Sequence, residues 1–221
     1  MARRLALFDL DNTLLAGDSD HAWGEFLISK QLVDADTHRA ENDRFYQQYM
    51  AGELDIHGYV EFTLQPILKL SKAERTALHA EFMRDVIGPL YLAKADALVA
   101  RHQDDGDLTL IITATNDFIT APIAERFRVT HLIATELEMD GERFTGNISG
   151  TPCYQLGKVD KLEQWLAQEN PGLSLQDAIF YSDSINDLPL LQRVATPVVV
   201  DPDTKLNQAA IERGWQIISL R

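Results

Sequence analysis

Residues 5–15 read LALFDLDNTLL, a short apolar run that ends in two alternating carboxylates. The run 5–10 has the length and composition of a strand buried on both faces, because such strands are continuously apolar. Asp9 and Asp11 are two residues apart, so both side chains leave the strand on the same side. An isolated pair of this kind also occurs in strand-end turns, where Asp accepts backbone hydrogen bonds. Residues 5–15 therefore predict a strand with a polar cluster at its carboxyl end.

Five further apolar runs repeat the strand pattern, at residues 108–113, 132–135, 178–181, 198–200 and 216–220. Amphipathic stretches of helical length lie between most of them, at residues 91–103, 117–127, 158–168 and 204–213. Strand and helix in alternation predict an α/β fold, a Rossmann-like parallel sheet with helices on both faces. Residues 137–150, centred on Asp140-Gly141, predict a β-hairpin.

Residues 15–88 break the alternation, because the pattern stays helical throughout. Helices are predicted at residues 21–32, 35–50, 56–68 and 72–86. Ser71 and Glu74 have the spacing of a capping box at the start of the last one. An all-helical insert directly after the first strand is most simply a cap over the carboxyl edge of the sheet, where open α/β sheets bind ligands. We expect an α/β catalytic core of residues 1–14 plus 89–221 and a helical cap of residues 15–88.

The composition narrows the class of partner. With 34 acidic and 20 basic residues, the formal net charge is −14, and no Lys/Arg cluster of the kind that binds nucleic acid is present. No apolar run approaches the ~18 residues of a membrane span. Cys153 is the single cysteine, so no internal disulfide can form and a cytoplasmic location is expected. We expect a small-molecule ligand, assign no role to Cys153 and leave the oligomeric state open.

A second acidic pair, Asp183 and Asp187 in YSDSINDLPLL, follows the predicted strand 178–181. Taken alone, Asp183 would more often be a helix cap than a metal ligand. Carboxylates that follow two strands of one parallel sheet converge at its carboxyl edge, and several oxygens there suit a hard cation such as Mg²⁺. The candidate metal ligands are Asp9, Asp11, Asp183 and Asp187.

Two further segments are candidate anion sites. Thr113 ends a predicted strand, and Ala114 and its neighbours precede a helix, so a hydroxyl and free backbone amides lie at a helix N-terminus. The same pattern is equally typical of an ordinary N-cap. Lys158 lies at another helix start, which is unfavourable for positive charge unless an anion is near, although a lone surface lysine is usually just solvated.

Together and in this order, these segments resemble the motifs of the haloacid dehalogenase-like hydrolase superfamily. Asp9-x-Asp11-x-Thr13 resembles its first motif, Thr113 the second, Lys158 the third and Asp183-x-x-x-Asp187 the fourth. The helical insert and YSDSINDLPLL are similar to the phosphoserine phosphatase-like subfamily. The resemblance implies a Mg²⁺-dependent phosphatase, a phosphomonoester hydrolase acting on a small metabolite.

The resemblance also implies roles for individual residues. Asp9 would attack phosphorus to give an aspartyl-phosphate, and Asp11 would serve as general acid and base. Mg²⁺ would be held by Asp9, the backbone carbonyl of Asp11, and Asp183. The phosphate-binding residues would be Thr113, Ala114 and Lys158, while Asn186 and Asp187 would orient the metal's surroundings and the substrate.

The substrate is indicated by the start of the insert. Asp18 occupies the position of the acidic residue that binds the substrate's amino group in phosphoserine phosphatases, although helix capping by Ser19 or Asp20 is an equal explanation for these residues. The string GDSDHAWGEFL, residues 17–27, is more similar to a bacterial branch with members assigned as histidinol-phosphate phosphatases. That branch implies histidinol phosphate as substrate, bound by Asp18 or Asp20 and stacked on Trp23.

Other activities stay open at this point. Phosphoserine would need a cation for its carboxylate, and spacing singles out none of Arg39, Arg44, Arg75 and Arg84. A phosphotransferase and a catalytically silent binding protein on the same fold are the remaining alternatives. The aromatic residues Phe45, Tyr46, Tyr49, Phe62 and Phe82 are expected in the core of the cap. The histidines His38, His57, His79 and His102 are expected at the surface.

Overall fold

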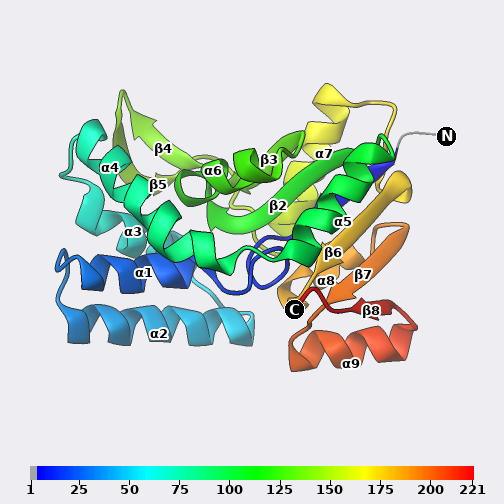
Figure 1. Ribbon diagram of the computed structural model, residues 1–221, viewed down its shortest axis with the longest axis horizontal. Coiled ribbons are helices and arrows are strands. Elements are labelled where there is room, and N and C mark those ends of the chain that lie inside the picture. The colour runs from blue at the N-terminus through cyan, green and yellow to red at the C-terminus, as the bar shows by residue number, and fades with distance from the viewer. Residues whose placement is uncertain (1–3) are drawn as a thin grey trace.

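The computed structural model describes residues 4–221, so residues 1–3 of the predicted core lie outside the described part of the chain. A six-stranded parallel sheet has the order β3-β2-β1-β6-β7-β8. Its strands are β1 (Leu5–Phe8), β2 (Leu108–Asn116), β3 (His131–Thr135), β6 (Ala178–Ser182), β7 (Thr196–Val200) and β8 (Gln216–Ile218). The predicted α/β fold is confirmed, and Figure 1 shows the sheet with helices on both sides.

Alternate residues of β1 face the two helical layers. Leu5 and Leu7 pack with α7 (Leu156–Glu169) and α9 (Thr204–Arg213). Ala6 and Phe8 pack with α5 (Ala93–Asp104) and α6 (Asp117–Phe127). All four of these β1 side chains are fully buried. This burial on both faces explains why the first strand reads as a continuous apolar run.

Residues 15–88 form a helical segment between β1 and α5. It contains α1 (Ser19–Ser29), α2 (Ala35–Ala51), α3 (Ile56–Leu64) and α4 (Lys72–Phe82), followed by a π-helical turn (Met83–Ile87) and a 3₁₀ turn (Gly88–Leu90). The helix predicted at 56–68 ends early as a 3₁₀ turn, Gln65–Ile67, because Pro66 lacks the N–H that a continuing helix needs. The predicted capping box at Ser71 and Glu74 is present. In Figure 1 these helices lie together at one end of the sheet.

The two chain connections between the helical segment and the sheet domain lie side by side. Leu15 and Tyr91 form an isolated antiparallel bridge, and the N–H of Ala16 donates to the carbonyl of Leu90 (2.8 Å). The chain therefore leaves and re-enters the sheet domain at adjacent points.

A short hairpin packs against α4. Strands β4 (Leu137–Asp140) and β5 (Arg143–Ile148) pair antiparallel, as predicted. The Arg75 guanidinium donates to the carbonyl of Glu142 at the hairpin turn, and Lys72 Nζ lies 2.6 Å from a Glu142 carboxylate oxygen. Arg75 also lies over the ring of Phe144 on β5. The hairpin thus ties the helical segment to the sheet domain at a second place.

Two expectations about side-chain placement are wrong. His102, expected at the surface, is buried behind β6, with Nδ1 2.8 Å from Asp107 and Nε2 2.9 Å from the Tyr181 hydroxyl. His38 is also buried, because its ring stacks on Phe62.

The remaining elements are the 3₁₀ turns Leu175–Asp177 and Ile185–Asp187 and the short helix α8 (Leu188–Leu191). No helix among residues 4–221 is long and apolar enough to cross a membrane.

Candidate active site

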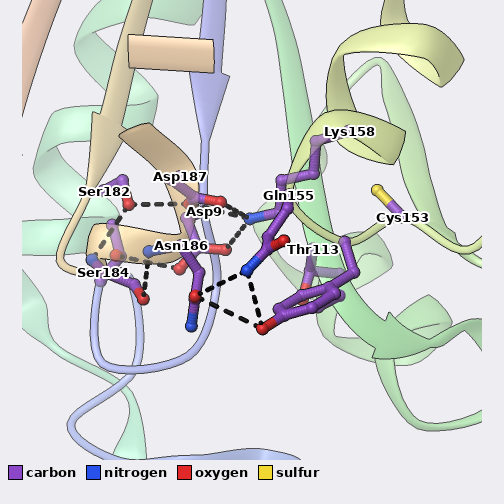
Figure 2. Close-up of polar contacts among 12 residues, drawn as sticks. Asp9, Thr113, Cys153, Gln155, Lys158, Ser182, Ser184, Asn186 and Asp187 are labelled. Atoms are coloured by element: carbon purple, nitrogen blue, oxygen red, sulfur yellow. Dashed lines mark hydrogen bonds and ion pairs between the residues drawn. The ribbon is translucent and has the colours of Figure 1, made fainter. Parts of the chain in front are cut away.

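Asp9 follows β1 at the polar edge of the sheet. Its N–H donates to the carbonyl of Tyr181 (2.9 Å), which fixes it beside β6. The residue is 5% exposed. Its Oδ1 lies 2.8 Å from Lys158 Nζ, and its Oδ2 lies 3.3 Å from Thr13 Oγ1. Figure 2 shows the Lys158 ammonium reaching both Asp9 and Asp187.

Lys158 is a buried cation, not a solvated surface lysine. It lies in the first turn of α7, and Gly157 before it allows a close approach to Pro152: a Cβ at Gly157 would lie 2.0 Å from the Pro152 carbonyl oxygen. The residue is 3% exposed. Burial opposes its charge, but the carboxylates of Asp187 and Asp9 outweigh burial and hold the pKa of Lys158 above its ordinary value. The fold therefore keeps a positive charge beside Asp9.

Asp187 is the second partner of this lysine. Its Oδ1 lies 2.7 Å from Lys158 Nζ and its Oδ2 lies 2.8 Å from the same atom. The Ser182 hydroxyl donates to Oδ2 over 2.7 Å. Burial raises the pKa of Asp187 to about 6 against the opposing effect of Lys158. Both oxygens of Asp187 thus contact Lys158, which supports a role in positioning the lysine, and direct metal ligation by Asp187 stays a prediction.

Asp183 lies next to Asp9 through a shared hydroxyl. Thr13 Oγ1 donates to Asp183 Oδ1 (2.9 Å) and accepts from the Asp183 N–H (3.1 Å), while remaining 3.3 Å from Asp9 Oδ2. Burial, and then the negative charge of Asp9, raise the pKa of Asp183 well above its ordinary value. Two carboxylates brought this close, one buried and one half-buried, are stable as anions only with a compensating positive charge.

The carboxylates here fit a hydrated divalent cation better than a closed protein cage. Asp9 and Asp183 supply two carboxylates, and among residues 4–221 no group of three or more His, Cys, Asp or Glu side chains is arranged as a metal cluster. Mg²⁺ characteristically binds through one or two carboxylates and keeps several waters. Backbone oxygen and water would complete such a site.

Asp11 is held by two hydrogen bonds. The Ser19 N–H donates to its Oδ1 (2.6 Å) and the Thr115 hydroxyl to its Oδ2 (2.8 Å). Burial, and then the charge of Asp18, raise its pKa to about 6 despite these donors. A carboxyl group with this pKa exchanges its proton readily near neutral pH, which suits acid and base catalysis.

Thr113 and Ala114 line the site from β2. This strand continues to Asn116 instead of ending at Thr113 as predicted. The Asn116 side chain caps α6 by accepting from the Ile119 N–H (3.2 Å), so the alternative of Thr113 as an N-cap is wrong. Thr113 Oγ1 accepts from the Thr115 N–H (3.2 Å), which leaves its hydroxyl proton free to donate.

A cavity of about 50 Å³ lies between the sheet edge and the helical segment. It is lined on the sheet side by Asp9, Asp11, Thr113, Ala114 and Thr115. On the helical side it is lined by Asp18, Asp20, His21, Asn42, Phe45, Tyr46, Tyr49, Leu54, Ile56, Tyr59 and Val60. The expectation that Phe45, Tyr46 and Tyr49 belong only to the core of the cap is therefore wrong. The structure brings Asp18 and Asp20 to the same cavity as Asp9 and Asp11.

Asp18 has a capping role as well as a place in the cavity. Its Oδ1 accepts from the N–H groups of Asp20 (3.0 Å) and His21 (2.8 Å), which makes it the N-cap of α1. Capping thus falls on Asp18 and not on Ser19 or Asp20. Burial raises the pKa of Asp18.

Two predicted substrate-binding residues lie elsewhere. Trp23 is 1% exposed and packs edge-on against Phe82 (5.0 Å between ring centroids) and Phe118 (5.6 Å), outside the cavity lining. The Asn186 amide donates to the carbonyl of Tyr49 (2.8 Å) and so contacts the end of α2. Trp23 was chosen for its residue type within the string 17–27, and residue type does not show which face of α1 meets the cavity.

A protein-family model described as haloacid dehalogenase-like hydrolase matches residues 6–192. The chain belongs to the haloacid dehalogenase-like hydrolase family. The matched region runs from β1 to the end of α8 and includes every motif residue described above.

Relatives within this family carry phosphatase names. The chain is 46% identical over 221 residues to a histidinol-phosphatase of Neisseria meningitidis, with 99% of this chain and 100% of the relative covered. It is 32% identical over 222 residues to a phosphoserine phosphatase of Mycobacterium tuberculosis, covering 98% of this chain and 70% of the relative. A solved structure of a protein of unknown function from Bordetella pertussis Tohama I matches with a TM-score of 0.91 and 46% identity over 100% of both chains. This member of the haloacid dehalogenase-like hydrolase family is a phosphatase.

Sequence reasoning missed several residues of this haloacid dehalogenase-like site. Thr115 is two residues after Thr113 on β2, so the two-residue period of a strand could have placed both on one face. Asn42 lies in the middle of α2, and no local signal separates it from a surface residue. Cys153 is fully buried, and burial raises the pKa of its thiol to about 12.

Proposed function

We propose that this phosphatase hydrolyses a small phosphomonoester through an aspartyl-phosphate on Asp9. A carboxylate oxygen of Asp9 attacks phosphorus, the alcohol leaves, and water then cleaves the acyl phosphate. The observation that carries the proposal is the buried contact between Asp9 and Lys158. A fixed cation beside the nucleophile offsets the charge that gathers on the phosphoryl oxygens in the transition state. The free proton of the Thr113 hydroxyl provides a further donor to these oxygens.

Asp11 carries the proton in both steps. Its neutral form donates to the leaving alcohol oxygen, and its anion then accepts a proton from the attacking water. The hydrogen bonds from Ser19 and Thr115 fix the direction of its carboxyl group. A pKa of about 6 allows both forms to exist near neutral pH.

Mg²⁺ is the proposed cofactor, held by Asp9, Asp183 and the backbone carbonyl of Asp11. When bound, it would neutralise the two neighbouring carboxylates and polarise a phosphoryl oxygen. The raised pKa of Asp183 and the shared Thr13 hydroxyl support a cation at this place.

Replacement of the nucleophile tests the chemical proposal. We expect Asp9→Asn to lower kcat at least about a thousandfold, because an amide oxygen does not form the acyl phosphate. Inorganic phosphate release is measured with and without added Mg²⁺. The matched control is Asp36→Asn, because Asp36 is an exposed residue of α2. Turnover that persists in Asp9→Asn, or in the native enzyme with excess chelator, contradicts the proposal.

The proposed substrate class is an amine-bearing phosphomonoester, with histidinol phosphate favoured. The cavity lining contains the carboxylates of Asp9, Asp11, Asp18 and Asp20, and among the described residues that line it none is Lys or Arg. A substrate that brings its own positive charge would relieve this excess. The relative named histidinol-phosphatase, at 46% identity over the full chain, supports this choice.

Phosphoserine is the second candidate, because a 32% identical relative carries that name. Its carboxylate would need a cation, and each of the four arginines of the helical segment is engaged outside the cavity lining. Arg39 pairs with Glu25, Arg44 with Glu41, Arg84 with Asp85, and Arg75 donates to the carbonyls of Leu70 and Glu142. This arrangement favours an amino alcohol phosphate over an amino acid phosphate.

A phosphate-release screen across phosphorylated metabolites tests the substrate class. We expect histidinol phosphate to be the best substrate and phosphoserine to be poor. Comparable weak turnover of every compound would reject a specific substrate. An added alcohol that competes with water for the phosphoryl group would indicate a phosphotransferase, and a lack of turnover of any compound would indicate a binding protein.

A further inference from the structure

Asp20 is a buried carboxylate of the cavity that the proposed reaction does not use. It lies in the first turn of α1, is 9% exposed and lines the cavity. Its Oδ1 is inaccessible to solvent and has no hydrogen-bond partner among residues 4–221. A buried carboxylate oxygen without a donor is costly, because desolvation is not compensated.

Asn42 is a second such acceptor, on the neighbouring helix α2. It is 1% exposed and lines the same cavity. Its Nδ2 donates to the carbonyl of His21 (3.1 Å), and since a carbonyl only accepts, the amide oxygen must point the other way. That Oδ1 is buried and has no partner in the described part of the chain.

Gly24 allows this placement of Asn42. A Cβ at Gly24 would lie 2.6 Å from Asn42 Nδ2, so any larger residue would displace the amide. Helices α1 and α2 thus pack closely enough to bury the Asn42 amide, although its oxygen has no hydrogen-bond donor in the described part of the chain. Native proteins rarely leave such groups unsatisfied, and a ligand that supplies donors is a direct explanation.

The neighbours of these two acceptors define the ligand chemistry. Phe45, Tyr46 and Tyr59 line the same side of the cavity and provide apolar and π surfaces, which suit a flat cationic ring or an alkylammonium group. Burial, followed by the charges of Asp18 and Asp11, raises the pKa of Asp20 well above its ordinary value. A bound cation would lower this repulsion, whereas a bound carboxylate would increase it.

We propose that Asp20 and Asn42 form a specificity pair, two buried acceptor oxygens that select phosphomonoesters carrying positively charged N–H donors at the end away from phosphate. The pair is distinct from Asp18, whose Oδ1 is already engaged in capping α1. The inference rests on the proposed function, because it assumes that the phosphate end of the substrate lies at Asp9.

The test is a ratio of specificity constants. We compare kcat/KM for two cationic esters, histidinol phosphate and phosphoethanolamine, with kcat/KM for 4-nitrophenyl phosphate, which has no N–H group. For Asp20→Asn and for Asn42→Leu, we expect this ratio to fall about tenfold to a hundredfold through KM of the cationic esters, as is usual when a hydrogen bond to a charged group is lost. Asp36→Asn removes the same charge from the exposed face of α2 and should leave the ratio unchanged.

A stability measurement separates recognition from a structural role. Asp20→Asn keeps the volume of the side chain and removes a buried carboxyl group whose Oδ1 has no hydrogen-bond partner among residues 4–221, so we expect its Tm at pH 7.5 to be no lower than that of the native protein. A Tm that falls, or a loss of activity that is equal for all three substrates, would show a structural role and overturn the inference.

The substrate preference of the native enzyme and the activity of Asp9→Asn distinguish failure of the specificity pair from failure of the proposed function. If the native enzyme hydrolyses 4-nitrophenyl phosphate but prefers neither cationic ester, the specificity pair is overturned while the aspartyl-phosphate chemistry stands. If Asp9→Asn retains turnover, the chemical proposal itself fails.

Discussion

Lys158 belongs to a network that includes three carboxylates of the site. It contacts Asp9 and Asp187 directly, and Asp9 shares the Thr13 hydroxyl with Asp183. The sequence pattern predicts each of these residues as a candidate, because motif spacing and strand ends are local features. The packing of α7 against β1 and β6 decides which carboxylates contact the lysine. These elements are far apart in the sequence, so the spacing of the motifs does not predict the contacts.

Loss of the lysine should destabilise the fold as well as abolish activity. We expect Lys158→Met to lower the free energy of unfolding by about 3–5 kcal/mol, because two buried carboxylates lose their compensating charge. Urea denaturation measures the change. Lys72→Met, which removes an exposed ion pair with Glu142, should cost about 1 kcal/mol or less.

The contact between Lys158 and Asp187 predicts that the effects of substituting these two residues on stability are coupled. Adding Asp187→Asn to Lys158→Met should recover part of the lost stability, because one of the two uncompensated charges is then removed. Additive losses from the two substitutions would contradict the assignment of Asp187 as the partner of the lysine.

At the scale of elements, helices with clear caps were predicted well. The bounds of α6 and α9 agree with their predicted ranges, where Asn116 and Asp203 accept hydrogen bonds from the first turns. The end of β2 was misjudged because Thr115 and Asn116 are polar and resemble loop residues. Instead, the Thr115 hydroxyl donates to Asp11 in the site, and the Asn116 side chain caps α6. The unpaired oxygens of Asp20 and Asn42 could not be predicted, since they depend on how α1 packs against α2.

The C-terminal end of α2 is held by side chains of the sheet domain. Carbonyls in the last turn of a helix lack partners within the helix. Here the carbonyl of Tyr49 accepts from Asn186 (2.8 Å) and that of Gly52 accepts from Gln155 (3.0 Å). Figure 2 shows Gln155 and Asn186 side by side, with the Gln155 amide donating to the Asn186 side-chain oxygen. Since the cavity holds about 50 Å³, enough for only a few water molecules, we propose that this end of α2 must move for a substrate to bind.

Weakening this contact should loosen the end of α2. For Gln155→Ala, we expect the amides of Gly52 and Glu53 to exchange with deuterium about threefold to tenfold faster, because one hydrogen bond to this turn is lost. Hydrogen exchange read by mass spectrometry measures the change. Gln168→Ala, on the exposed face of α7, is the control, and equal exchange in both variants would argue against α2 as a moving element.

For the whole molecule, the formal charge of −14 is less informative than where the charges lie. In the centre of the site, Asp9 and Asp187 contact the ammonium of Lys158, and Asp183 is linked to Asp9 through the Thr13 hydroxyl. The excess of negative charge is local, and a divalent cation of the size of Mg²⁺ would offset it. The acidic composition is therefore compatible with a small phosphate ester as substrate.

Binding of Mg²⁺ should stabilise the whole fold. At a concentration about a hundred times its Kd, a bound ion adds about 2.7 kcal/mol, which corresponds to a rise in Tm of roughly 5–10 °C for a chain of this size. We expect Asp183→Asn to lose most of this rise and Asp36→Asn to keep it. Differential scanning calorimetry with and without chelator measures it, and an equal rise in both variants would place the ion elsewhere.

The most direct measurement is kcat/KM for histidinol phosphate and for phosphoserine with the same enzyme preparation at saturating Mg²⁺. A cavity rich in acceptors, with no lysine or arginine among the described residues that line it, predicts a ratio of at least about a hundred in favour of histidinol phosphate, since like-charge repulsion and an unpaired carboxylate both oppose phosphoserine. Equal constants, or a preference for phosphoserine, would contradict the account.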